Sequence, residues 1–194
     1  HQILYPMRTT SDDNSFENQN LWNVDEKLAY HYYLASDFKF SQMEPLEIES
    51  DKRPDILVFD KPTAFVEGDF PFYSVVIIEL KKPEKKDYSV DKNPIQQIYD
   101  YIDILKSGKA EDRNNAVIRL DDKTRFYCYI LANLTTQMER FSKSYRLSKT
   151  PDNMGYYGYN DNYNAYVEVM DYKKLLEDSK KRNRVLFDKL GLSH

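Results

Sequence analysis

Residues 73–80, YSVVIIEL, contain the longest purely aliphatic run of the chain and end in charge. Their β-branched residues predict a buried strand. Side chains alternate between the two faces of a strand, so Glu79 and Lys81 project from the same face, about 7 Å apart. Unpaired charges are costly to bury. Either the strand end emerges into solvent, where such residues are ordinary, or the two charges belong to a functional site.

The rest of the sequence alternates strand and helix patterns. Residues 55–60, DILVFD, predict a second strand, and the loop with Pro62 and Pro71 favours antiparallel pairing with 73–80. Asn93-Pro94 is typical of a helix start. The expected helices are 18–35, 94–106, 135–145 and 171–190, and the remaining expected strands are 44–50, 125–132 and 163–170. The tyrosine-rich residues 156–166 are expected to form a loop. This order predicts an α/β or α+β fold, with a mixed central sheet flanked by helices.

Composition excludes several classes of protein. With 28 Lys and Arg against 32 Asp and Glu, the net charge is −4, so nucleic acid could be bound only through local basic patches. No apolar stretch approaches the roughly 20 residues of a membrane span, so no membrane partner is expected. A single cysteine, Cys128, excludes an internal disulfide and predicts a reducing, cytoplasmic compartment. We interpret the missing initiator Met as the sign of a domain cut from a longer protein.

Asp55 suggests what the charged strand end could do. In an antiparallel hairpin the start of one strand lies beside the end of the other, so Asp55 and Glu79 are expected to converge. Two carboxylates and the Leu80 carbonyl would suit Mg²⁺, which takes few protein ligands. Such an ion polarises a phosphoryl oxygen and acidifies water. Lys81 would neutralise developing charge or orient the attacking water.

Pro54-Asp55 followed by Glu79-Leu80-Lys81 resembles the motif of the PD-(D/E)XK nuclease superfamily. Gln97 and Tyr101 fit the Gln-x-x-x-Tyr element of its exonuclease-like branch, and their i, i+4 spacing places them on one helix face. The resemblance implies that this face looks toward the metal and the substrate phosphate.

The resemblance also implies a fold. It predicts one nuclease-like domain over 1–194, with a restriction-endonuclease-like αβββαβ core at about 18–132 and a C-terminal elaboration at 133–194 that adds a strand and a helix. Glu26, in the expected first helix, resembles the upstream acid of the family and would tune the metal or help bind a second ion.

The sequence therefore predicts a Mg²⁺-dependent nuclease that Mn²⁺ also supports, acting on DNA. Pro151-Asp152-Asn153-Met154-Gly155 and the tyrosine-rich stretch resemble the C-terminal domains of bacterial proteins with a GHKL-type ATPase, which implies a fused or partner ATPase. The alternative is an inactive nuclease-fold module that binds nucleic acid or protein within such an ATPase-containing protein. Lys82, Lys85 and Lys86 form either a solvated loop or a rim that follows phosphates. The sequence leaves the oligomeric state open. The expected site residues are Glu26, Asp55, Glu79, Leu80, Lys81, Gln97 and Tyr101.

Overall fold

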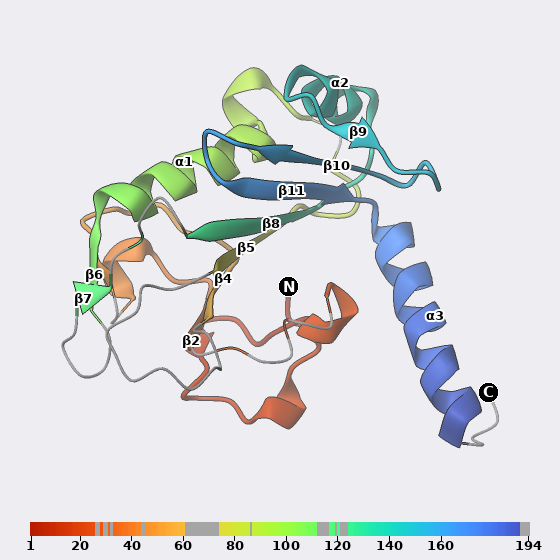
Figure 1. Cartoon of the computed structure of the whole chain (residues 1–194), viewed down its shortest axis with the longest axis horizontal. Coiled ribbons are helices and arrows are strands. Elements are labelled where there is room, and N and C mark those ends of the chain that lie inside the picture. Colours follow the sequence, from red (N-terminus) through yellow and green to blue (C-terminus); the bar gives the residue numbers. More distant parts are fainter. Residues whose placement is uncertain are drawn as a thin grey trace.

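A mixed open sheet of eight strands forms the centre of the protein (Figure 1). The computed structural model describes residues 1–25, 28, 31, 33–43, 46–60, 74–85, 87–111, 117–118, 120 and 124–190. In spatial order the strands are β1 (Thr9–Thr10), β2 (Tyr33–Ser36), β4 (Ile56–Asp60), β5 (Ser74–Leu80), β8 (Arg125–Leu131), β11 (Ala165–Met170), β10 (Gly155–Asn160) and β9 (Ser148–Lys149). Strand β8 runs parallel to β5 and β11, and every other neighbouring pair is antiparallel.

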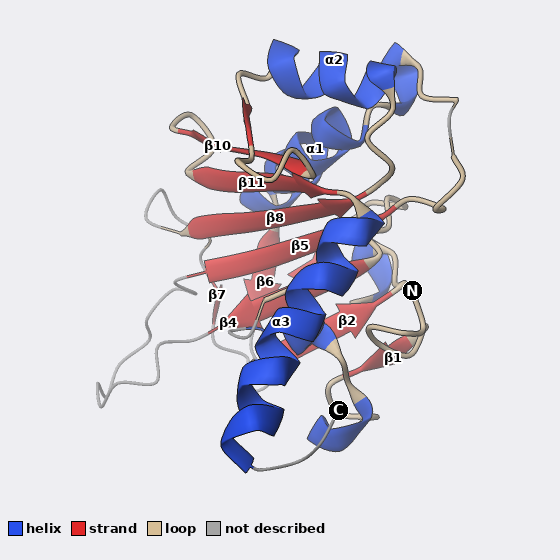
Figure 2. Cartoon of the chain, turned by 90° about the vertical axis from the view of Figure 1, so that its right-hand side faces the viewer, coloured by secondary structure: helices blue, strands red, loops and turns tan. Residues whose placement is uncertain are grey.

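Helices cover the two faces of this sheet unequally. The described residues contain α1 (Pro94–Ser107), α2 (Thr136–Ser144) and α3 (Tyr172–Leu190). Helices α1 and α2 lie on one face, while α3 and the N-terminal segment lie on the other (Figures 1 and 2). A small separate sheet contains β3 (Leu46–Glu47), β6 (Lys109–Glu111) and β7 (Val117–Ile118).

Strand alternation divides the core into two layers. In β5, Val75 and Ile77 pack toward α1, whereas Val76 and Ile78 pack toward the N-terminal segment. The neighbouring strands follow the same alternation, so both faces of the central strands are buried. Glu79 follows Ile77 by two residues and therefore belongs to the α1 face.

Several expected elements are confirmed. Strands β4 and β5 form the predicted antiparallel pair, with Ile56 opposite Ile78. Helix α1 begins where the cap was expected, because Asn93 Oδ1 accepts a hydrogen bond from the backbone N–H of Ile95 at 3.0 Å. The predicted strands at 125–132 and 163–170 and the predicted helices at 135–145 and 171–190 correspond to β8, β11, α2 and α3.

The expected helix over 18–35 is wrong in its described part. The chain forms two short 3-10 turns, η1 (Phe16–Asn18) and η2 (Leu21–Asn23), and then enters the central sheet as β2. Leu21, Val24 and Leu28 do share one buried cluster, as their spacing suggested. The asparagines at 18, 20 and 23 weaken helix formation because their side chains compete for the backbone.

Two further expectations need correction. In the described part of the strand expected at 44–50, only β3 forms, and it pairs with β6 outside the central sheet, so the first core strand is β2 instead. The tyrosine-rich residues form β10 and its turn into β11, not a loop. Tyr156 is buried while Tyr157 and Tyr159 are exposed, which is the period-two pattern of a strand.

Among the described residues, no helix is both long and apolar enough to cross a membrane.

Candidate active site

Asp55 and Glu79 meet across the β4–β5 hairpin. The pairing of Ile56 with Ile78 places Asp55 directly opposite Glu79 when the ladder is extended by one residue. Directly opposite residues of an antiparallel pair point to the same face. Asp55 is fixed there because its Oδ2 accepts a hydrogen bond from the backbone N–H of Leu80 at 2.6 Å. The hairpin therefore brings together the two carboxylates, as the sequence predicted.

Lys81 and Gln97 complete a network around Glu79. The Lys81 ammonium lies 2.5 Å from Glu79 Oε1 and donates to Gln97 Oε1 at 2.9 Å. The Gln97 amide nitrogen donates to the same Glu79 Oε1 at 3.1 Å. Gln97 lies in the first turns of α1, so the helix holds the carboxylate and the ammonium in one arrangement.

Tyr101 links this network to the chain before Asp55. Its hydroxyl donates to the Arg53 carbonyl at 2.9 Å and accepts a short hydrogen bond from the Gln97 amide. Tyr101 is 2% exposed and packs edge-on against Phe40, so its position is well fixed. Tyr101 thus connects α1 to the segment that leads into β4.

Burial and mutual repulsion dominate the electrostatics of the two acids. Glu79 is only 4% exposed. Burial, and next the charge of Asp55, raise the pKa of Glu79 to about 7, although Lys81 and Gln97 oppose the shift. Burial also raises the pKa of Asp55, which the Leu80 N–H and the Lys81 charge partly offset. A nearby positive charge would favour the ionised form of both groups.

The charges and the carboxylate oxygens of Asp55, Glu79 and Lys81 taken together suit a divalent cation. When all three are ionised, their charges sum to −1. Glu79 Oε2 is buried and has no hydrogen-bond donor among the described residues. Such an oxygen can ligate a hard cation. The described residues contain no group of three or more His, Cys, Asp or Glu side chains arranged to hold a metal ion. Glu26 lies outside the described residues.

Asp37, Arg53 and Tyr172 join the site although sequence reasoning missed them. Asp37 directly follows β2, and its backbone N–H donates to the Asp55 carbonyl at 2.8 Å. Tyr172, the first residue of α3, donates its hydroxyl to the Lys81 carbonyl. No local pattern marks these residues, because their partners lie far away in the chain.

The role of Lys82, Lys85 and Lys86 as a rim that follows phosphates remains a prediction. Lys82 is exposed, and Lys85 Nζ lies 5.7 Å from the centre of the Tyr88 ring. Lys86 lies outside the described residues.

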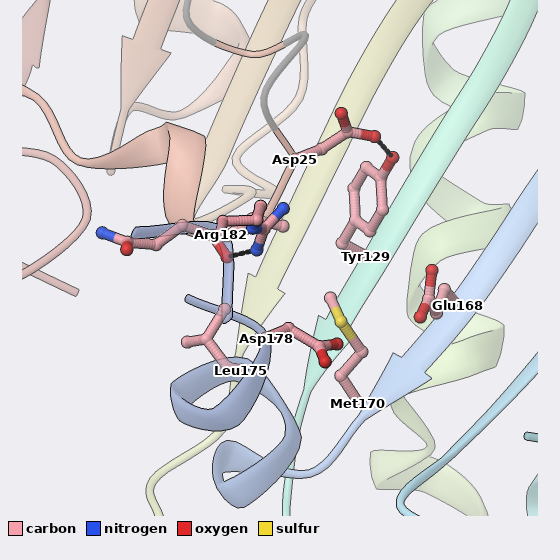
Figure 3. Close-up of a pocket in the computed structure, with 9 residues that line it drawn as sticks. Asp25, Tyr129, Glu168, Met170, Leu175, Asp178 and Arg182 are labelled. Carbon is pink, nitrogen blue, oxygen red and sulfur yellow. Dashed lines mark hydrogen bonds between the residues drawn. The ribbon is translucent and has the colours of Figure 1, made fainter. Parts of the chain in front are cut away.

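A separate pocket of about 360 Å³ opens on the opposite face of the sheet, beneath α3 (Figure 3). It shares no residue with the Asp55–Glu79 site, and its acids already have partners. Tyr129 donates to Asp25 at 2.7 Å, Tyr166 donates to Glu168 at 3.1 Å, and Lys174 contacts Asp178. The pocket therefore forms part of the packing of α3 against the sheet.

Comparisons of the chain with protein-family models, with curated proteins and with solved structures find no match in any of the three.

Proposed function

We propose that the protein is a Mg²⁺-dependent nuclease that hydrolyses phosphodiester bonds, with DNA as its substrate. One observation carries the proposal. Five of the six side chains predicted from sequence lie together at the β4–β5 end: four share direct hydrogen bonds, Asp55 joins them through the Leu80 backbone N–H, and Glu79 has a buried oxygen without a donor in the described structure. The side chains of this network are Asp55, Glu79, Lys81, Gln97 and Tyr101.

Asp55 and Glu79 would hold the Mg²⁺ ion, together with the Leu80 carbonyl that the sequence predicted. Such an ion, when bound, would supply positive charge for the phosphate and lower the pKa of water. Mn²⁺ prefers the same oxygen ligands and is expected to substitute.

The other residues have roles that follow from their contacts. Lys81 lies against Glu79, where its ammonium would stabilise the extra charge on the phosphate during hydrolysis. Gln97 holds the Lys81 ammonium and the Glu79 carboxylate in place. Tyr101 fixes Gln97 relative to the chain that carries Asp55. A contribution of Glu26 stays a prediction.

Cleavage of plasmid DNA tests the proposal. The wild-type chain with Mg²⁺ or Mn²⁺ should nick or linearise the plasmid, and EDTA should stop the reaction. Asp55→Ala and Lys81→Ala should lose at least a hundredfold in rate, as expected for electrostatic groups at a reacting phosphate. Lys149→Ala is the matched control, because Lys149 is an exposed cation on the edge strand β9, four strands away from β5. Cleavage by both site variants at the wild-type rate would refute the mechanism.

The alternative is a catalytically inactive module that binds nucleic acid or protein within a larger ATPase-containing protein. The net charge of −4 favours the protein-binding form of this module, because bulk attraction for nucleic acid is absent. Calorimetry separates the two proposals. An inactive module should bind neither Mg²⁺ nor Mn²⁺ at neutral pH, whereas the nuclease should bind both through Asp55 and Glu79. The GHKL-type ATPase as partner stays a prediction.

A further inference from the structure

Asp37, Asp55 and Glu79 lie in one row across three adjacent strands. The ladders of β2 with β4 and of β4 with β5, extended by one residue, place them opposite one another. Asp37 is close enough to Asp55 that its charge contributes to the raised pKa of that carboxyl. With strands about 4.8 Å apart, Asp37 lies roughly 10 Å from Glu79 along the row.

Two arginines converge on Asp37. Arg53 Nε lies 3.2 Å from Asp37 Oδ1, and Arg8 Nε lies 3.6 Å from Asp37 Oδ2. Asp37 is 8% exposed, while the Arg8 and Arg53 side chains are 77% and 48% exposed. One arginine would neutralise this aspartate, and the second offsets the charge of −1 that Asp55, Glu79 and Lys81 carry together when ionised.

The contacts leave the ends of both guanidinium groups available. Each arginine approaches Asp37 through Nε, and no described residue accepts a hydrogen bond from the Nη groups of either side chain. The terminal N–H groups of a guanidinium form a rigid fork that matches two oxygens of a phosphate. Two such forks beside one another, in contact with solvent, are suited to an anion with several oxygens.

The pair is also fixed relative to the two acids. The Arg53 carbonyl accepts the Tyr101 hydroxyl, and the Asp37 N–H donates to the Asp55 carbonyl. Arg8 and Asp37 both adopt left-handed backbone angles, with φ of 56° and 59°. Such angles are costly for residues other than glycine and persist where the surrounding contacts impose them.

We propose that Arg8 and Arg53 form a phosphate-binding pair. The pair would hold a backbone phosphate neighbouring the phosphodiester that lies at Asp55 and Glu79. Its ligand class is therefore a chain of phosphodiesters, DNA or RNA, and not a single phosphate ester. The position of the second phosphate rests on the proposed nuclease function, whereas the binding of phosphate by the arginines does not.

Equilibrium binding in EDTA tests the pair without cleavage. The probes are a fluorescein-labelled DNA duplex and a single-stranded RNA of the same sequence, titrated at several KCl concentrations. Arg8→Ala and Arg53→Ala should each weaken binding about tenfold. The double variant should also make the slope of log K against log[KCl] shallower by about 1.8 for the duplex, since each lost phosphate contact contributes about 0.9.

Two further variants distinguish this role from simple neutralisation of Asp37. Arg53→Lys keeps the charge but loses the fork, so its binding should be intermediate while its fold is retained. Lys149→Ala removes a cation at the far edge of the sheet and should bind as the wild type does. If the arginine variants lose affinity for both DNA and RNA, the pair binds backbone phosphate in general. If they lose affinity for only one of the two polymers, the pair is specific for that polymer.

Several outcomes would overturn the proposal. The first is an affinity and a salt slope in the double variant that equal those of the wild type. The second is a loss of affinity in Lys149→Ala as large as that in the arginine variants. The third is that the wild type binds neither polymer. Its failure is separable from that of the nuclease. If binding depends on the arginines but no metal-dependent cleavage occurs, only the proposed nuclease function is refuted. If the protein cleaves DNA but binding does not depend on the arginines, only the phosphate-binding pair is refuted.

Discussion

The Lys81 ammonium lies 2.5 Å from one oxygen of Glu79, while the other oxygen of that carboxylate is buried and receives no hydrogen bond in the described part of the chain. Lys81 therefore satisfies only one side of Glu79. Asp55, on the neighbouring strand, adds a second negative charge. The negative charge that Lys81 does not compensate is therefore buried, so the site should favour binding of either a proton or a cation.

We predict that Mn²⁺ affinity rises with pH as Glu79 ionises. Because burial and Asp55 raise the pKa of Glu79 to about 7, a proton competes with the cation below that value. The affinity should increase roughly tenfold per pH unit below about 7 and level off above it. Calorimetry at several pH values measures this dependence.

Two variants control that experiment. Glu79→Gln should abolish both the binding and its pH dependence. Glu139→Gln changes a carboxylate of α2 that pairs with Lys149 on β9, the edge strand four positions from β5, and should leave both unaltered. A pH-independent affinity in the wild type, or normal binding by Glu79→Gln, would show that Glu79 is not a ligand.

Without metal, Glu79 should make the protein less stable as pH rises. Its pKa is about 7 in the folded state and 4.5 when exposed, so the folded state binds this proton more tightly than the unfolded chain does. The contribution is fully present below about pH 4.5 and is lost as pH rises through about 7. At about 1.4 kcal/mol per pKa unit, the loss is on the order of 3 kcal/mol.

Urea unfolding in EDTA at pH values spanning this interval measures the effect. Glu79→Gln cannot ionise there, so its free energy of unfolding should decline less than that of the wild type by about the same 3 kcal/mol. Parallel pH profiles for the two proteins would place the titrating group elsewhere.

Much of the site could be predicted from sequence because its determinants are local. Asp55 and Glu79 flank two strands whose β-branched residues are evident, and an antiparallel hairpin brings their ends together. Gln97 and Tyr101 share a helix face because of their spacing, and Asn93-Pro94 marks where that helix begins. Each inference used only short-range pattern and one strand pairing.

The remaining features depend on contacts distant in sequence. Leu21, Val24 and Leu28 have helical spacing, yet short turns bury them equally well, and β2 is decided by its pairing with β1 and β4. Asp37 looks like an ordinary polar residue after a short apolar run. Its contact with Asp55 exists only because β2 lies beside β4.

Tyr101→Phe should weaken the site's scaffold without removing a metal ligand. The variant loses the hydrogen bond to the Arg53 carbonyl and the one from Gln97. Each such bond contributes about 1 kcal/mol, so the free energy of unfolding should fall by about 1 to 2 kcal/mol. Nuclease activity should fall at least fivefold, while Mn²⁺ affinity changes less than twofold. Loss of metal binding with activity would instead make Tyr101 part of the metal site.

Tyr172→Phe tests whether α3 supports the site from the opposite face. The Tyr172 hydroxyl donates to the Lys81 carbonyl, and the ring packs against the buried cluster on that face of the sheet. Removing the hydroxyl leaves that packing, so stability should fall by only about 1 kcal/mol. Activity should fall several-fold, because the Lys81 backbone loses a fixed partner. Tyr159→Phe is the control, since Tyr159 is exposed on β10 and its hydroxyl contacts only Asn164 among the described residues. Equal activity in the two variants would show that α3 merely packs against the sheet.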